Sequence, residues 1–188
     1  GSAIPSAAED YTIDNSLRFE NGDSAYLSRT PSVAGNTKTY TLSFWAKRGE
    51  NDFRGYMFSA AGGGNDGIEF QADNVIRFFC SAGYGDKTTS AVYRDPSAWY
   101  HIVMAIDTTL ASASDRMRLY VNGEEITSFS SSSDPSQDST GDINDTEVQY
   151  VGRVGSSDAS HYDGYLAEFY LIDGTQLDAD DFGELDST

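Results

Sequence analysis

The sequence predicts an all-β protein built as an antiparallel β-sandwich. Many short stretches of alternating apolar and polar residues are separated by turn signals rich in Gly, Asn and Asp. Helical periodicity is almost absent, and the one exception is Leu177–Phe182, where we expect a single helical turn. A chain of 188 residues suits one domain whose core needs no crosslink. No internal repeat is visible, which argues against a propeller or a solenoid.

We expect residues 1–10 to be a tag and linker, and residues 11–188 to form one domain. Gly1-Ser2 resembles a remnant of cloning, and neither a signal peptide nor an apolar run of about 18 residues is present. Asn21-Gly22-Asp23 predicts a hairpin turn that joins Leu17–Phe19 to Ala25–Leu27.

The remaining strands are predicted from alternation between turn signals. Turns are expected at Asp73-Asn74, Tyr84–Asp86 and Asn122-Gly123, and a loop at Gly62–Gly67. The expected strands, in chain order, are Thr39–Lys47, Tyr56–Ala60, Ile68–Ala72, Val75–Cys80, Thr88–Tyr93, Trp99–Asp107, Arg116–Val121, Glu124–Phe129, Val148–Val154 and Tyr165–Ile172.

Three segments carry sharper expectations. In Thr39–Lys47 the residues Leu42, Phe44 and Ala46 share one face, and Thr41, Ser43, Trp45 and Lys47 share the other. Thr127–Thr146 holds seven serines and four aspartates, so we expect a long loop there, either solvated or ordered by a ligand. Asp163-Gly164 opens the last strand, whose two faces are Tyr165, Ala167, Phe169 and Leu171 against Leu166, Glu168, Tyr170 and Ile172.

Four segments in order resemble the laminin-G-like branch of the concanavalin A-like lectin/glucanase superfamily. They are Tyr40–Lys47, Trp99–Ile106, Met117–Gly123 and Tyr162–Ile172. The resemblance runs from Leu17 to about Phe182 and implies a concanavalin A-like jelly roll of two antiparallel sheets. Because lectins, adhesins and hydrolases share that fold, the resemblance does not select a function.

The formal charge of −18, from 30 acidic and 12 basic residues, argues against nucleic acid as a partner and against anionic membrane surfaces. The acidity serves solubility, or alternatively binds cations. The single Cys80 cannot form an internal disulfide, and its apolar strand predicts a buried, inert thiol.

The sequence predicts no catalytic residue. Retaining glucanases that this fold resembles carry Glu-x-Asp-x-x-Glu on one strand. Glu184-Leu185-Asp186 begins this pattern, but the chain ends two residues later, and the adjacent Glu124-Glu125 face opposite sides of a strand. We expect His101 to be a packed histidine. A glycoside hydrolase with a carboxylate pair from distant strands stays open as an alternative.

Calcium is the expected cofactor, because oxygen-rich loops suit this cation. The resemblance implies two kinds of calcium site, and Ala167 stands where relatives place an acid on the convex sheet. A site at the loop rim is therefore favoured; the alternative is that these residues form Asx turns. The predicted ligands are Asn65, Asp66, Asp142, Asn144 and Asp145.

Sugar recognition requires an aromatic plane together with polar groups that meet hydroxyls. Tyrosines beside glycine or aspartate turns look loop-borne and exposed, and His161 lies in a polar loop. Each tyrosine could instead cover its own hairpin. The predicted ligand-binding residues are Arg54, Tyr56, Tyr84, Asp86, His161 and Tyr162.

Leu17–Thr30 and Asp163–Glu184 are similar to laminin-G-like domains in structural and fibre proteins of tailed phages. This resemblance implies a module of a virion protein, at the virion surface or extracellular, that contacts other virion subunits and forms a homotrimer in the full-length protein. We therefore expect a non-catalytic recognition module that binds a cell-surface glycan or polysaccharide. The first alternative is a purely structural or decoration domain.

Overall fold

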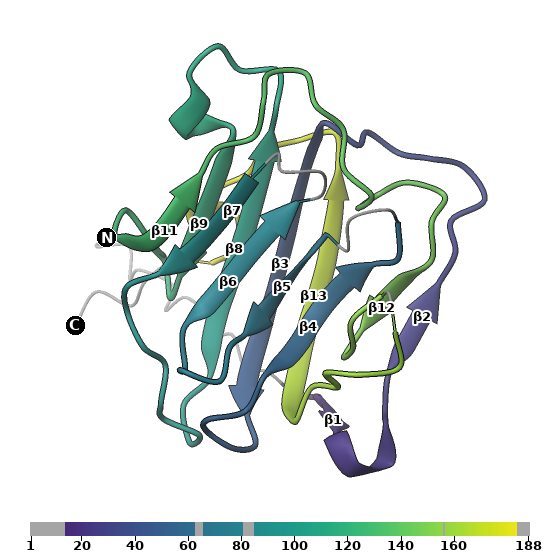
Figure 1. Ribbon diagram of the computed structural model, residues 1–188, viewed down its shortest axis with the longest axis vertical. Helices are drawn as coiled ribbons and strands as arrows, with labels where there is room; N and C mark the ends of the chain where they lie inside the picture. Colours follow the sequence, from purple (N-terminus) through teal and green to yellow (C-terminus); the bar gives the residue numbers. More distant parts are fainter. Residues whose placement is uncertain (1–13, 63–65, 81–84, 156, 184–188) are drawn as a thin grey trace, which may run out of the picture.

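The computed structural model describes residues 14–62, 66–80, 85–155 and 157–183, and these form two stacked antiparallel sheets (Figure 1). The predicted all-β sandwich is thus confirmed. Sheet A contains, in spatial order, β1 (Leu17–Phe19), β13 (Gly164–Asp173), β3 (Thr39–Arg48), β8 (Tyr100–Asp107), β9 (Met117–Val121) and β10 (Glu124–Glu125). Sheet B contains β11 (Phe129–Ser133), β7 (Gly85–Thr89), β6 (Ile76–Cys80), β5 (Gly67–Phe70), β4 (Gly55–Ala60), β12 (Gln149–Val151) and β2 (Leu27–Arg29).

The helical content of the described residues is three short 3₁₀ turns: η1 (Asn21–Asp23), η2 (Ala113–Asp115) and η3 (Ala179–Phe182). The last of these confirms the helical turn predicted near the C-terminus. Within the described part of the chain, no helix has the length and apolar character that crossing a membrane requires.

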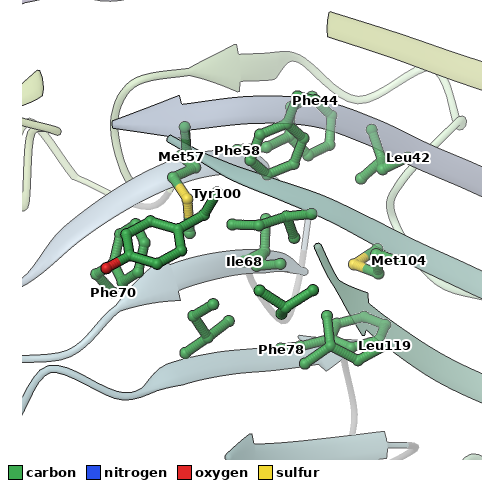
Figure 2. Packing of buried hydrophobic residues seen from close by; sticks show 14 of the residues in the cluster. Leu42, Phe44, Met57, Phe58, Ile68, Phe70, Phe78, Tyr100, Met104 and Leu119 are labelled. Atoms are coloured by element: carbon green, nitrogen blue, oxygen red, sulfur yellow. The ribbon is translucent and has the colours of Figure 1, made fainter. Parts of the chain in front are cut away.

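The core lies between the two sheets. Leu42, Phe44 and Ala46, which share one face of β3, are fully buried. Figure 2 shows Leu42, Phe44 and Met104 of sheet A facing Phe58 and Ile68 of sheet B. Burial of each such side chain contributes about 1.5–3 kcal/mol, so this layer is the main source of stability.

The C-terminal segment covers part of the outer face of sheet A. Thr41 Oγ1 donates to Thr175 O at 2.8 Å and accepts from Leu177 N at 2.9 Å. Ala179 and Phe182 of η3 pack on Val103, Ala105 and Tyr120. Apolar residues on this outer face are therefore buried by the chain's own C-terminal segment.

The predicted hairpin around Asn21–Asp23 is wrong. β1 pairs with β13 in sheet A, whereas β2 pairs with β12 in sheet B, so the η1 turn crosses from one sheet to the other. Both strands are edge strands of three residues, too short for alternation to reveal their partners.

Two further expectations in sheet B are corrected. The serine-rich stretch contains β11, an edge strand whose backbone pairs with β7 while its serine side chains face solvent. An exposed edge strand needs no apolar alternation, which is why the pattern suggested a loop. The turn expected at Tyr84–Asp86 is also displaced, because β7 already begins at Gly85.

Strict alternation along β13 fails at Glu168. The pairing with β3 shifts register between Ala167 and Tyr170, and Glu168 adopts the left-handed region with φ of 47°. This bulge shifts the inward and outward alternation by one residue. Leu166 faces the core before the bulge, and Phe169 and Leu171 pack toward the core after it.

Candidate functional site

The outer face of sheet B carries a row of charged side chains. Glu69 on β5 pairs in register with Tyr56 on β4 and with Arg77 on β6. Residues in register share a face of the sheet, and the core residues Ile68 and Phe78 occupy the opposite face. The charged row therefore lies on the outside of the sandwich, on the sheet that faces the viewer in Figure 1.

Glu69 is the anchor of this row, with a side chain that is completely buried. Arg54 Nε donates to Glu69 Oε2 at 2.6 Å and Arg54 Nη2 donates to Oε1 at 3.1 Å. Arg77 Nη1 lies 3.5 Å from the same Oε1, and Gln71 Nε2 donates to it at 3.3 Å. A buried carboxylate with this many donors fixes the positions of both arginines.

Asp86 completes the row on β7. Arg77 donates from Nε at 3.0 Å to Oδ1 and from Nη2 at 2.5 Å to Oδ2. Hydrogen bonding to Asp86 raises the pKa of Arg77, and the bond to Glu69 raises that of Arg54. The side chains of Arg54 and Asp86 are 48% and 39% exposed, so a donor and an acceptor are both accessible to solvent.

Two aromatic rings lie beneath the arginines. The guanidinium carbon of Arg54 is 5.4 Å from the Tyr56 ring centre, and that of Arg77 is 4.5 Å from the Phe79 ring centre. Tyr56 and Phe79 meet edge to face at 6.0 Å and form a small buried cluster with Val154. These rings support the guanidinium planes and are themselves covered.

A second polar and aromatic cluster lies toward the β12 and β2 side of sheet B. The guanidinium of Arg153 stacks on Tyr26 at 4.8 Å and on Tyr150 at 4.4 Å. Asp158 accepts from Arg153 Nη1 at 3.1 Å and lies 3.0 Å from His161 Nε2. Tyr26 is 44% exposed, whereas Arg153 and His161 are buried.

Sequence reasoning found half of the first cluster. Arg54, Tyr56 and Asp86 are brought together, but Tyr56 is buried rather than exposed, because Arg54 covers it. Tyr84 lies outside the described residues. The residues that sequence reasoning missed are Glu69, Arg77 and Phe79. Their signal was present: each of the two charged residues sits between core residues in a strand of the hairpin predicted around Asp73-Asn74.

The expected exposure of Tyr162 is wrong. Its side chain is buried between Phe19 and Phe70, with ring centres at 6.3 and 6.5 Å, and its hydroxyl donates to Lys47 O at 2.9 Å. Burial raises the pKa of this phenol. His161 is likewise buried, because its ring packs near Tyr26 and bonds to Asp158. Neither side chain is available as a loop-rim contact.

The predicted metal ligands are only partly assembled. Asp66 is fully buried and its Oδ2 accepts from Asp142 N at 2.6 Å, so the Asp66 carboxylate contacts the backbone of Asp142. Asn144 instead donates to Asp173 Oδ1 at 2.6 Å, and Asp145 accepts from Thr146 N at 2.7 Å. Asn65 lies outside the described residues. Among the residues that are described, no three His, Cys, Asp or Glu side chains are grouped as metal ligands, and calcium stays a prediction.

A hollow opens at the side of the sandwich where the edges of the sheets part. Its volume is about 680 Å³, and an adjoining hollow of about 510 Å³ shares Leu27, Val151 and Phe169 with it. Leu17, Leu27 and Val33 are exposed at the rims of these two hollows by 54%, 49% and 77%. The lining is mainly apolar, so it suits contact with another apolar surface better than contact with a hydroxyl-rich ligand.

The remaining nucleophilic and basic candidates are structural. Cys80 is buried, as predicted, and burial raises the pKa of its thiol. His101 is packed on the outer side of sheet A, with Nε2 at 3.0 Å from Ser43 Oγ and its ring stacked on Trp45. Burial lowers the pKa of His101.

Solved structures share this fold at low sequence identity. Domains LG4-5 of the mouse laminin alpha1 chain match with a TM-score of 0.53 and 16% identity, over 78% of this chain and 38% of that one. A SAP-like pentraxin from Limulus polyphemus matches at 0.50 and 14%, over 78% and 68%. A sialidase from Trypanosoma rangeli matches at 0.51 and 14%, over 77% of this chain but 22% of the enzyme.

At these identities the likeness shows the fold alone, and the chain spans less than half of the laminin and sialidase chains. No curated protein matches significantly. The sequence profile of one family, however, matches residues 19–180, which is most of the chain and nearly the whole described sandwich. The chain therefore belongs to the laminin G-like family Laminin_G_3 of the concanavalin A-like lectin/glucanases superfamily.

Proposed function

We propose that this domain is a non-catalytic module that binds glycan on the outer face of sheet B. The observation that carries the proposal is the row formed by Arg54, Glu69, Arg77 and Asp86. It offers fixed donors from Arg54 and a fixed acceptor in Asp86, both accessible to solvent. Sugar hydroxyls bind both donors and acceptors of this kind. The family name, which joins lectins with glucanases, supports a carbohydrate ligand.

The row favours a neutral sugar. Its two guanidinium groups are each paired with a carboxylate, so the four side chains together have no formal net charge. A carboxylate or sulfate on the ligand would compete with Asp86 or Glu69 for donors that are already engaged. Sugar hydroxyls can instead add to Asp86 and to the exposed part of Arg54 without breaking either ion pair.

Glycoside hydrolysis is the less favoured use of the same residues. Glu69 is fully buried under two arginines, and Asp86 accepts from both Nε and Nη2 of Arg77. A general acid and a nucleophile both need direct access to the scissile bond. These two carboxylates instead hold the arginines in place.

We propose, as a finer assignment, that the module belongs to a tailed-phage fibre or structural protein, acts at the virion surface or extracellularly, and binds a host-surface glycan or polysaccharide. The similarity of Leu17–Thr30 and Asp163–Glu184 to such domains supports this context. Calcium bound near Asp66 and Asp142 remains part of the proposal. It predicts that calcium raises the melting temperature at constant ionic strength, and that Asp142→Asn removes the rise.

A glycan array tests the proposed function. The native domain is expected to bind, and Arg54→Ala should weaken binding at least about tenfold, because charge-assisted hydrogen bonds contribute about 1.5–3 kcal/mol. Arg18→Ala is the matched control. Arg18 also pairs with a carboxylate, Glu20, and lies over a tyrosine ring, Tyr165, but belongs to β1 in sheet A. Equal binding by both variants, or no binding by the native domain, would contradict the proposal.

A purely structural role is the second candidate, and the apolar hollow favours it. Exposed Leu17, Leu27 and Val33 at one side of the sandwich are suited to contact with other virion subunits, including copies of the same protein in a trimer. Sedimentation of the native domain should then show a concentration-dependent oligomer that Leu27→Asp dissociates. A monomer at every concentration, with clear glycan binding, would leave recognition as the function.

A further inference from the structure

The cluster around Tyr26 lies on the same outer face as the charged row. Tyr150 on β12 pairs in register with Ser59 on β4, which pairs with Gly67 on β5. Gly67 pairs with Phe79 on β6, and Phe79 pairs with Asp86 on β7. Residues joined in this way share one face of the sheet, and the hydrogen bond from Ser59 Oγ to Arg153 O places Arg153 beside the same row.

Together the two clusters extend over a length that only several sugar units can cover. Asp86 and Tyr150, at the far ends of the two clusters, are four strand spacings of about 4.8 Å apart, which is about 19 Å. One monosaccharide cannot bridge this distance, whereas a chain of several sugars can. Val154 packs on Tyr56 and Phe79 between the clusters, so a bridging chain passes over the segment that carries Val154.

Tyr26 has the properties of a stacking platform. The Arg153 guanidinium lies over its ring at 4.8 Å, and its ring centre is 5.7 Å from that of Tyr150 and 6.2 Å from that of His161. These contacts hold the ring in place while 44% of the residue remains exposed. A fixed, half-exposed aromatic ring binds the apolar C–H face of a sugar at little cost in side-chain entropy.

Asp158 supplies the polar partner of this platform. Its side chain is 69% exposed, although one oxygen is held by both Arg153 and His161. A carboxylate that is held by two protein side chains and is still exposed to solvent accepts hydrogen bonds from sugar hydroxyls. Tyr26 and Asp158 thus offer one apolar and one polar contact to the same sugar ring.

We infer that Tyr26 and Asp158 form a second glycan subsite, so that the ligand is a neutral polysaccharide chain read at two places on sheet B. This inference rests on the proposed function, since the charged row is the first subsite. It predicts that affinity increases with chain length until the ligand spans both subsites, and that Tyr26 matters only for ligands of that length.

The test measures binding by calorimetry to cello-, malto- and manno-oligosaccharides from disaccharide to octasaccharide, preceded by an array of neutral glycans that selects a further series if one binds better. Tyr26→Ala should weaken binding of the longest members by about tenfold and leave the disaccharide unchanged. Tyr26→Phe keeps the ring and should restore the affinity. Tyr170→Ala is the matched control, because Tyr170 is 45% exposed but lies on β13 in sheet A.

The outcomes separate the two proposals. Loss of binding in Arg54→Ala, together with no effect of Tyr26→Ala at any chain length, would overturn the second subsite and keep the proposed function. Absence of binding to every neutral glycan would overturn both. A melting curve for each variant shows whether it folds; if Tyr26→Ala does not, Asp158→Asn replaces it and should show the same dependence on chain length.

Discussion

At the scale of single residues, Tyr162 shows how far burial can depart from a local sequence signal. Its position before Asp163-Gly164 suggested an exposed ring, yet the ring packs between Phe19 and Phe70. Tyr162→Phe removes only the hydroxyl, which leaves the Lys47 carbonyl without this donor. We expect a loss of about 1 kcal/mol in unfolding free energy and unchanged glycan binding. Denaturant titration and the array measure the two effects, and a loss of binding without a loss of stability would contradict the assignment.

His101 gives a prediction about pH. Burial lowers its pKa below the usual 6.5, so the unfolded chain takes up the proton first. The stability that the neutral ring contributes is therefore complete above pH 6.5 and is lost as the pH falls from 6.5 toward the folded-state pKa. The slope for one group is at most about 1.4 kcal/mol per pH unit.

The variant His101→Gln isolates this effect, because the carboxylates titrate alike in both proteins. We expect the native protein to lose stability more steeply than His101→Gln when denaturant titrations are repeated from about pH 7.5 to about pH 5.5. Parallel pH profiles would show that the imidazole is protonated equally easily in the folded and unfolded chains.

At the scale of elements, the start of β13 depends on one glycine. Gly164 has φ of 142°, and a Cβ there would overlap the Lys47 carbonyl oxygen of β3. Gly164→Ala should therefore cost about 1–3 kcal/mol for the backbone conformation alone, with the overlap adding to it. Gly22→Ala is the control, since no atom lies within 4 Å of its Cβ position, and it should change stability by less than about 0.5 kcal/mol. Thermal melting compares them, and similar midpoints would refute this role for Gly164.

The elements that sequence predicted well are those whose two faces differ. β3, with Leu42 and Phe44 inward, is recognisable because alternation records burial directly. β11 is not, since an edge strand of serines buries little apolar surface. β1 and β2 were assigned to one hairpin because local sequence specifies a turn but not the sheet that each strand joins. The bulge at Glu168 was missed because a strand sequence does not mark which residue is left unpaired.

In the candidate site, too, local sequence indicates some residues, whereas the contacts between them depend on strand pairing. Arg54 and Asp86 were predicted from residue type alone, and the structure adds what holds them: Glu69 and Arg77 from the strands between. That bridge is a contact across three strands, so it depends on register rather than on any local pattern. Tyr26 and Asp158 are further apart in sequence and meet through Arg153, a contact that no spacing in the sequence indicates.

At the scale of the whole molecule, the net charge of −18 repels anionic ligands. The site can therefore be tested by comparing how neutral and acidic glycans bind. A neutral glycan should bind equally well between about 0.05 and 0.2 M salt, because no ligand charge interacts with the field of the protein. A glycan that carries carboxylates should bind weakly at low salt, since the acidic surface repels it and both arginines of the row are already paired.

Asp86→Asn changes this balance while keeping the shape of the side chain. The row then carries one net positive charge, and Arg77 keeps only Glu69 as a charged partner. We expect neutral glycans to bind less tightly, because an amide supplies one acceptor oxygen where the carboxylate supplied two. Binding of carboxylate-bearing glycans should rise relative to neutral ones, and should weaken with salt. Titration calorimetry of both ligand classes at the two salt concentrations measures these relative affinities and their salt dependence. Tight, salt-sensitive binding of acidic glycans to the native domain would mean that the ion pairs open for the ligand, and that the row is selective for anions.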